Sequence, residues 1–298
     1  MESYTKLKPF VGISFGMVEL NILKSIWSHG IKFVNLKKKG GLGIKDDIIW
    51  NKVAVGKLAW WITSKADHLW VKWVNHTYIK NKEWHTYSLP AFSSWYWRKI
   101  CQVKDTFNEA YQQNLWSETI GNEYSIAKGY EFLRDKGETM NWHNMVWNTW
   151  SLPKHGFMAW IYQHKNMNTK DKLYKLGICS DDTCCICGHQ TETMDHIFFA
   201  CDYNKAVIKI VGHGIGVLLP TQNLREWSLR RGGSKIRFEL LNAVLNACIY
   251  HVWRQRNLSR YELTIDCPRK VASTIVDEMK IRIKGCLMTA SPTDKIWL

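Results

Sequence analysis

Residues 184–201 read Cys-Cys-Ile-Cys-Gly-His-Gln-Thr-Glu-Thr-Met-Asp-His-Ile-Phe-Phe-Ala-Cys, and this stretch guides the interpretation of the whole chain. Cys184 and Cys187 form a Cys-x2-Cys pair, and His196 and Cys201 form a His-x4-Cys pair beyond it. Zinc in structural sites prefers four nitrogen or sulfur ligands at the corners of a tetrahedron. The spacing therefore predicts a small Cys-Cys-His-Cys knuckle that binds Zn²⁺ through these four side chains.

The residues between the ligands indicate a closed, structural site. Gly188 directly follows the first pair, and glycine tolerates the positive φ that such a turn often requires. The apolar run at 197–199 can pack beneath the metal. No fifth group in the sequence offers an open coordination position, so the site is expected to be closed. Cys185 lies too close to Cys187 for the usual knuckle, so we expect it to be a bystander. The alternative is a group of buried thiols without a metal.

Composition places the chain among globular proteins with a large core. It has 298 residues, of which 46% are hydrophobic and 17 are Trp, and its formal net charge is +15. This charge suits a polyanionic partner such as RNA or DNA, although lysines and arginines can also simply solvate helix faces. The N-terminus shows no secretory signal, and no apolar run is long enough for a membrane span. We therefore expect a nuclear or cytoplasmic protein with reduced thiols that is neither secreted nor bound to a membrane.

Apolar residues recur at helical spacing in nearly every segment, which predicts a mainly α fold. We expect Trp-rich helices in two bodies joined near residues 103–123, with the zinc knuckle as the main irregular insertion in the second body. A short strand is expected at 124–126. The expected helices cover residues 17–27, 46–61, 69–79, from 95 onward, a segment through 130–133 after the strand, 142–150, 154–164, 170–176, 203–211, 236–257 and 271–287.

Four basic residues are the candidates for contacts with nucleic acid. Arg254, Arg256 and Arg260 cluster near the end of the clearest predicted helix, and Lys154 begins another. Between residues 60 and 100, lysines also alternate with tryptophans. That pattern is compatible with a surface that stacks bases and binds phosphates, but a Trp-rich core with lysines at its edge is the favoured interpretation.

A wider set of residues resembles one family. The matching positions are Trp147, Pro153, Lys154, Phe157, Trp160, Thr169, Leu173, Cys184, Cys187, Gly188, Glu192, His196, Phe198, Phe199 and Cys201. In this order and spacing they resemble the reverse-transcriptase zinc-binding domain of plant non-LTR retrotransposons, the long interspersed elements. The glycine-rich stretch 40–44 and the stretch 253–257 are similar to the regions that flank this domain in such elements.

The resemblance implies a division of the chain. Residues 1–30 are an N-terminal extension of uncertain nature, and 31–120 correspond to the helical region that follows the polymerase. Residues 121–215 correspond to the zinc-binding domain, and 216–298 form a basic C-terminal helical region.

The catalytic parts of a polymerase are not visible in the sequence. A reverse-transcriptase palm holds two metal ions on paired carboxylates that follow an aromatic residue. The pairs Asp46-Asp47 and Asp181-Asp182 lack that context, and we expect no ribonuclease H domain after them. We therefore expect a fragment with no catalytic residues and no enzymatic activity. The favoured function is non-specific nucleic-acid binding; the alternatives are a degraded copy without selected function and, less favoured, a residual reverse transcriptase.

Overall fold

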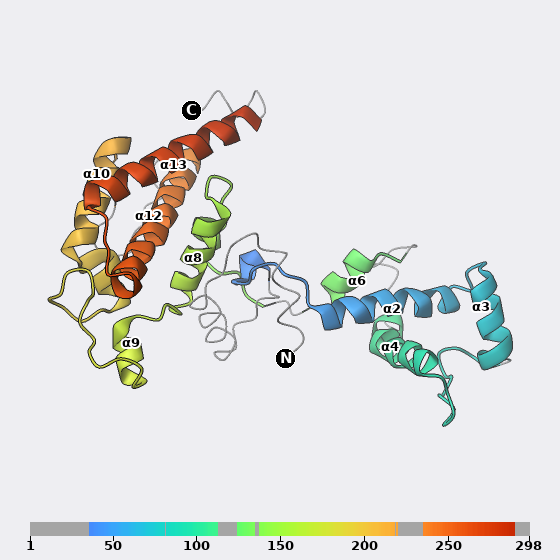
Figure 1. Ribbon diagram of the computed structural model, residues 1–298. Coiled ribbons are helices and arrows are strands. Elements are labelled where there is room, and N and C mark those ends of the chain that lie inside the picture. Colours follow the sequence, from blue (N-terminus) through green and yellow to red (C-terminus); the bar gives the residue numbers. More distant parts are fainter. Residues whose placement is uncertain are drawn as a thin grey trace. The chain divides into compact units, whose positions relative to one another are not determined.

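The computed structural model describes residues 36–80, 82–112, 124–134, 137–217, 219 and 235–289. Within these ranges the regular elements are helices, and the only β pairing is an isolated bridge between Thr183 and Thr191 (Figure 1). The predicted mainly α fold is thus confirmed. The predicted helix at 17–27 and residues 220–234 of the predicted basic C-terminal region lie outside the described residues.

The chain divides into two compact units. Of the described residues, 36 and those from 42 to 138 lie in unit 2, and 37–41 and those from 139 to 289 lie in unit 1. The division after residue 138 lies beyond the expected join at 103–123. Part of that stretch belongs instead to helix α4 (Trp95–Gln112). The domain ranges given by the sequence remain a prediction. They are based on the family resemblance, whereas the two units are defined by contacts between residues.

The described residues of unit 2 form four α-helices and one π-helical turn. They are α2 (Asp47–Thr63), α3 (Leu69–Val74), the π-helical η3 (Asn75–Ile79), α4 and α6 (Ile126–Leu133). Asp46 begins α2, because its carboxylate accepts hydrogen bonds from the backbone N–H groups of Ile48 and Ile49. Ser125 caps α6 in the same way, so the strand expected at 124–126 is wrong. A Ser at this position favours a helix start over a strand.

Helix α2 buries Val53, Gly56, Ala59 and Ile62, which recur every third residue. Asn51, which lies on another face of the helix, is exposed. Glycine at position 56 lets α2 approach its neighbours, since an added Cβ would lie 2.7 Å from the Phe107 ring and from the Tyr124 hydroxyl. The buried face of α2 is therefore the one that can pack closely against Phe107 and Tyr124, and not simply the one with the most apolar residues.

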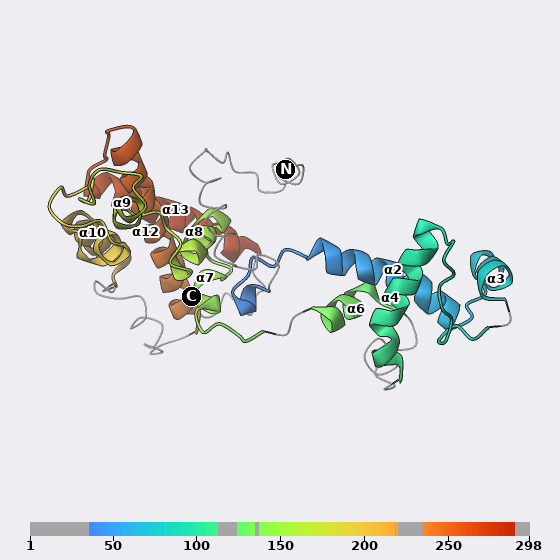
Figure 2. The same cartoon turned by 90° about the horizontal axis from the view of Figure 1, so that it is seen from below.

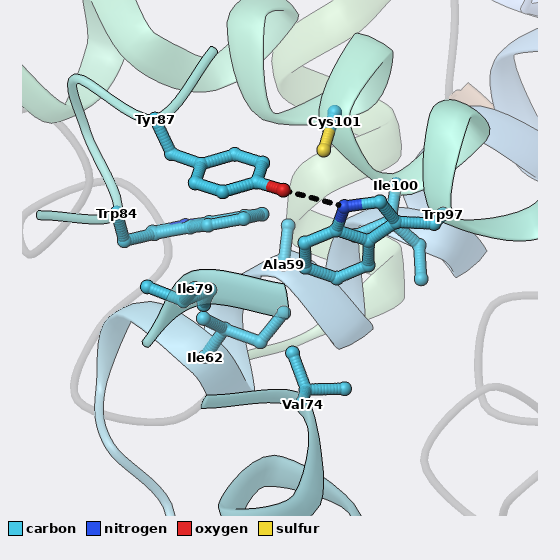
Figure 3. Packing of buried hydrophobic residues seen from close by; sticks show 9 residues of the cluster. All are labelled: Ala59, Ile62, Val74, Ile79, Trp84, Tyr87, Trp97, Ile100 and Cys101. Carbon is cyan, nitrogen blue, oxygen red and sulfur yellow. Dashed lines mark hydrogen bonds between the residues drawn. The ribbon is translucent and has the colours of Figure 1, made fainter. Parts of the chain in front are cut away.

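Aromatic side chains make much of the core of unit 2 (Figure 3). The indole of Trp97 is 2% exposed and donates a hydrogen bond to the Tyr87 hydroxyl at 3.2 Å. Its ring centroid lies 5.6 Å from that of Trp84, and Ile62, Val74 and Ile79 fill the space below. A second cluster joins Val53, Val103, Phe107 and Tyr130. Trp84 and Trp97 are core residues, as the favoured interpretation of the Trp-rich segment predicted, whereas Trp73 and Trp95 of the same segment are 53% and 63% exposed.

Unit 1 is organised around the long helix α12 (Lys235–Tyr261). Its other elements among the described residues are η2 (Lys37–Lys39), α7 (His143–Val146), α8 (Pro153–Gln163), α9 (Lys170–Lys175), the π-helical η4 (His196–Ala200), α10 (Asp202–Ile215) and α13 (Pro268–Thr289). Helix α12 contacts α7, α8, α10, α13 and η4 (Figures 1 and 2). Every residue from 242 to 249 is buried, so α12 is the central element of this unit.

The glycine-rich turn at 40–41 belongs to unit 1 although unit 2 follows it in sequence. The Gly40 carbonyl accepts hydrogen bonds from Trp160 Nε1 at 2.7 Å and from His164 Nε2 at 2.8 Å. Gly40 has φ +82°, a conformation that favours glycine, and an added Cβ would meet Met140 at 3.2 Å. The turn therefore packs against the C-terminal part of α8. Among the described residues, no helix is both long enough and apolar enough to span a membrane.

Lys104 provides a test of the aromatic core of unit 2. Its side chain is 8% exposed, and its ammonium donates to the backbone carbonyls of Trp84, His85 and Tyr87 at 3.4, 3.4 and 2.8 Å. Lys104→Ala should lower the free energy of unfolding by roughly 1–3 kcal/mol, because it leaves buried carbonyls without a donor. Urea unfolding followed by tryptophan fluorescence measures this. Lys99→Ala, an exposed position on the same helix, should change it by less than about 0.5 kcal/mol.

Candidate metal centre

The first two candidate ligands lie on a tight turn. Cys184 N–H donates to the Gln190 carbonyl at 2.7 Å, and Gly188 N–H donates to the Cys184 carbonyl at 2.8 Å. Gly188 has φ +71°, as the sequence predicted for this position. With the Thr183–Thr191 bridge below it, the turn forms a short hairpin whose tip carries Cys184 and Cys187.

The second pair is placed by a π-helical turn. His196 begins η4, and Cys201 N–H donates to the His196 carbonyl at 2.7 Å, which closes a hydrogen bond between residues five apart. Such a wide turn places its two ends on nearly the same side of the chain. Cys201 is also the residue that precedes α10, so the π turn and the start of this helix together position both ligands.

The structure brings all four predicted ligands together. The three sulfurs and one imidazole nitrogen lie within 4.8 Å of one another, and Cys187 Sγ is 3.3 Å from His196 Nε2. Tetrahedral bonds of about 2.0–2.3 Å to zinc correspond to ligand separations of roughly 3.3–3.8 Å, so a small contraction would complete the site. Cys184, His196 and Cys201 are buried, which suits a closed structural centre.

Backbone donors stabilise thiolates at the cluster. Amide N–H groups of Ile186 and Cys187 face Cys184 Sγ, and those of Tyr203 and Asn204 face Cys201 Sγ. Without a metal, the hydrogen bond with Cys201 and then burial raise the pKa of the Cys184 thiol above its ordinary value. The same hydrogen bond lowers the pKa of Cys201. In the metal-free protein, Cys184 and Cys201 therefore share one proton between their sulfur atoms. A bound metal ion would displace this proton.

A buried carboxylate ties this knuckle to the rest of unit 1. Glu192 Oε1 accepts from the Arg256 guanidinium, from Nε at 2.9 Å and from Nη2 at 2.6 Å, and both side chains are at most 1% exposed. The same oxygen accepts from Lys170 N–H at 2.8 Å, at the first residue of α9. Arg256 Nη2 also donates to the Asn168 carbonyl at 3.0 Å. The ion pair thus joins the knuckle, the start of α9 and α12.

Cys185 belongs to this carboxylate network and not to the metal cluster. Its thiol donates to Glu192 Oε2 at 3.1 Å, and its carbonyl accepts from the Ser259 hydroxyl at 2.8 Å. Burial, followed by the nearby Glu192 charge, raises the pKa of Cys185 to about 12. A thiol held protonated against a carboxylate is a poor metal ligand, which agrees with its predicted role as a bystander.

The four basic residues expected to contact nucleic acid lie in different environments. Arg256 is 1% exposed and fully engaged with Glu192, so the expectation that it offers a free charge at the surface is wrong. Lys154 pairs with Glu278 at 2.9 Å, and its ammonium lies 4.9 Å from the centre of the Tyr250 ring. Arg254 is exposed, and Arg260 is half-buried beside the Tyr261 ring. The position of these residues on the predicted helix did not reveal that Arg254 is exposed and Arg256 is buried.

One further group of polar side chains in unit 1 has no signal in the sequence. His155, His251 and Glu278 offer ligand atoms within 4.8 Å of one another, from α8, α12 and α13 respectively. No spacing motif connects them, because three distant helices contribute one residue each. Packing in unit 1 alone reveals the group.

Residues 124–207, which include all four clustered ligands, match the family model described as zinc-binding in reverse transcriptase. They form a reverse-transcriptase zinc-binding domain. The family resemblance found in the sequence is thereby confirmed for this segment. No significant match was found among curated proteins or among solved structures. The match covers the zinc-binding domain, and no catalytic domain of a reverse transcriptase is matched.

The zinc-binding domain extends across the division between the two units. Its first part, to residue 138, contains α6, which packs on α2 in unit 2. Its remaining part carries α7–α9, the knuckle, η4 and the first turns of α10. Arg256 lies beyond residue 207, so the partner of the buried Glu192 comes from outside the matched segment.

Substitution of neighbouring cysteines tests the identity of the ligands. Cys187→Ser should abolish metal binding at this centre, because a hydroxyl is a poor substitute for a thiolate ligand. Cys185→Ser should leave it intact. Metal content of each purified variant, measured by mass spectrometry and compared with wild type, checks both outcomes. Loss of this metal from Cys185→Ser would show that the assigned ligands are wrong.

The ion pair provides a second test. Arg256→Ala should lower the free energy of unfolding of unit 1 by about 3–5 kcal/mol, because it leaves the Glu192 carboxylate buried without a counter-charge. Arg254→Ala, two residues away and exposed, should change it by less than about 0.5 kcal/mol. Chemical unfolding of both variants measures the difference. Equal effects would indicate that the buried pair contributes little.

Proposed function

We propose that the chain is a zinc-stabilised module of retrotransposon origin that binds single-stranded RNA or DNA without sequence specificity. The zinc part rests on one observation: three sulfurs and one imidazole nitrogen converge from the knuckle and η4. A set of three thiolates and one imidazole is typical of structural zinc sites, and harder ions such as Mg²⁺ prefer oxygen ligands. Zinc would hold the hairpin against η4, and it has no open position for chemistry.

Nucleic-acid binding is supported by an exposed aromatic surface at the start of α4. We call Phe92, Trp95, Tyr96, Arg98 and Lys99 the α4 aromatic surface. Phe92, Trp95 and Tyr96 are 102%, 63% and 76% exposed, while the next residue, Trp97, is buried and anchors the helix. Exposed aromatic rings stack on bases of any sequence, and such stacking contributes about 1–3 kcal/mol per base.

Cations accompany these rings. Lys99 Nζ lies 5.9 Å from the centre of the Trp95 ring, and the Arg98 side chain is exposed beside it. The combination of rings for bases and cations for phosphates is what single-strand binding surfaces use. An exposed apolar patch alone would equally suit a protein partner, so the adjoining positive charges favour nucleic acid.

Unit 1 offers a second basic site on α12. Arg254 is exposed, and Arg260 lies 5.3 Å from the centre of the exposed Tyr261 ring. These two residues retain the role expected from the sequence, whereas Arg256 and Lys154 are committed to buried or half-buried ion pairs. The net charge of +15 would attract nucleic acid to either unit.

The experiment measures affinity for labelled oligothymidylate and oligouridylate across a salt series. Trp95→Ala with Tyr96→Ala should weaken binding at least about fivefold, since one stacked base contributes about 1–3 kcal/mol. Arg98→Gln with Lys99→Gln should reduce the slope of log K against log salt by up to about 1.4, and Arg254→Gln with Arg260→Gln should do the same.

The matched control is Tyr174→Ala, because Tyr174 is 51% exposed but has no role in the proposal. It should leave affinity and salt slope unchanged. No binding by the wild-type protein even at low salt would contradict the proposal and favour the alternative, a degraded element fragment without a selected function. Nucleotide incorporation above a no-protein control would support the less favoured residual polymerase.

A further inference from the structure

Three helices of unit 1 direct polar side chains into one buried position. His155 Nε2 on α8 and His251 Nε2 on α12 each lie 3.1 Å from Glu278 Oε2 on α13. The two imidazoles are 0% and 3% exposed, and the glutamate side chain is 28% exposed. This group is separate from the knuckle, because it shares no residue with the Cys184 cluster.

The imidazole of His155 is incompletely satisfied in this position. Its Nδ1 is buried without a hydrogen bond, and its Nε2 lies 3.1 Å from Glu278 Oε2 without a hydrogen bond of regular geometry. A buried polar group without a partner costs free energy, and in native proteins it often marks a bound ion or water. The nitrogen that faces Glu278 is therefore available to a ligand.

The protonation states suit coordination. Burial lowers the pKa of His155 to about 4 and also lowers the pKa of His251, so both rings are neutral near neutral pH. Burial alone would raise the pKa of Glu278, but hydrogen bonds from Lys154 and His251 outweigh it and hold the value at about 2. Neutral imidazoles and an ionised carboxylate are the forms that bind metals.

We propose that His155, His251 and Glu278 form a second metal site, for a divalent transition ion such as Zn²⁺ or Co²⁺. Their ligand atoms lie within 4.8 Å of one another. Two imidazoles and one carboxylate are a common ligand set for zinc and for neighbouring transition ions, and they leave one position for water. Two of the three ligands lie outside the matched zinc-binding domain, so the site is a property of the α8–α12–α13 packing.

Lys154 competes with this ion. Its ammonium binds the other carboxylate oxygen of Glu278, Oε1, at 2.9 Å, and so a metal on Oε2 would lie close to a positive charge. The site is therefore expected to bind more weakly than the knuckle, whose three thiolates bind a soft dication more strongly than imidazole and carboxylate ligands do. Removal of the ammonium should strengthen metal binding, an effect that a purely structural salt bridge does not predict.

The test titrates zinc into the metal-free full-length chain and counts bound ions by calorimetry and mass spectrometry. Wild type should bind two ions, one tightly and one weakly. His251→Gln and Glu278→Gln should each lose only the weak ion, and Cys187→Ser only the tight one. Lys154→Met should bind the weak ion at least about tenfold more tightly, because a like charge is removed from its surroundings.

Cobalt distinguishes this site from stray binding by other thiols. In Cys187→Ser loaded with Co²⁺, the weak site should show ligand-field bands without a thiolate charge-transfer band. Circular dichroism confirms that each variant is folded. One zinc ion in wild type, an unchanged weak ion in His251→Gln and Glu278→Gln, or no gain in Lys154→Met would overturn the second site. None of these results would bear on the knuckle, which Cys187→Ser tests separately.

Discussion

The buried ion pair between Glu192 and Arg256 is the interaction on which the zinc-binding domain of this chain depends. A single carboxylate, excluded from solvent, accepts hydrogen bonds from the guanidinium on α12, from the first residue of α9 and from Cys185 in the knuckle. Removing two charges from water is costly unless nearly every hydrogen-bonding position is filled, and here the network fills them. Because the carboxylate can satisfy all three partners in only one arrangement, it fixes the hairpin that carries Cys184 and Cys187 relative to α12.

This arrangement gives a physical meaning to two sequence patterns that looked independent. The Glu-x3-His pattern at 192–196 contributes a metal ligand and, four residues earlier, the acid that anchors the ligand hairpin. The Trp-x2-Arg-Asn pattern at 253–257 contributes the counter-charge, with the Arg256 guanidinium 4.7 Å from the centre of the Trp253 ring. The sequence alone predicts that Arg256 lies on a basic surface beside Arg254. The structure places it in the core, and the proposed nucleic-acid contacts shift to Arg254, Arg260 and the α4 aromatic surface.

Much of the helical fold could be predicted from sequence, because apolar spacing and capping residues act locally. Asp46 before α2, Gly188 in the knuckle and the four metal ligands are signals of this kind. Three features could not be predicted, since they depend on packing between distant segments. The burial of Gly56 depends on Phe107 and Tyr124, the docking of Gly40 depends on Trp160 and His164, and the His155–His251–Glu278 group depends on three helices meeting. The strand expected at 124–126 failed for a local reason, because Ser125 is a helix cap.

Calorimetric melting with and without a strong zinc chelator tests the central claim, that a metal at the Cys184–Cys187–His196–Cys201 centre stabilises unit 1. Unit 2 has its own aromatic cores and contains none of the four ligands. The account predicts two transitions in the zinc-loaded protein, of which the chelator lowers or abolishes the one from unit 1 and leaves the one from unit 2 in place. Two transitions that are unchanged by complete removal of the metal would contradict it.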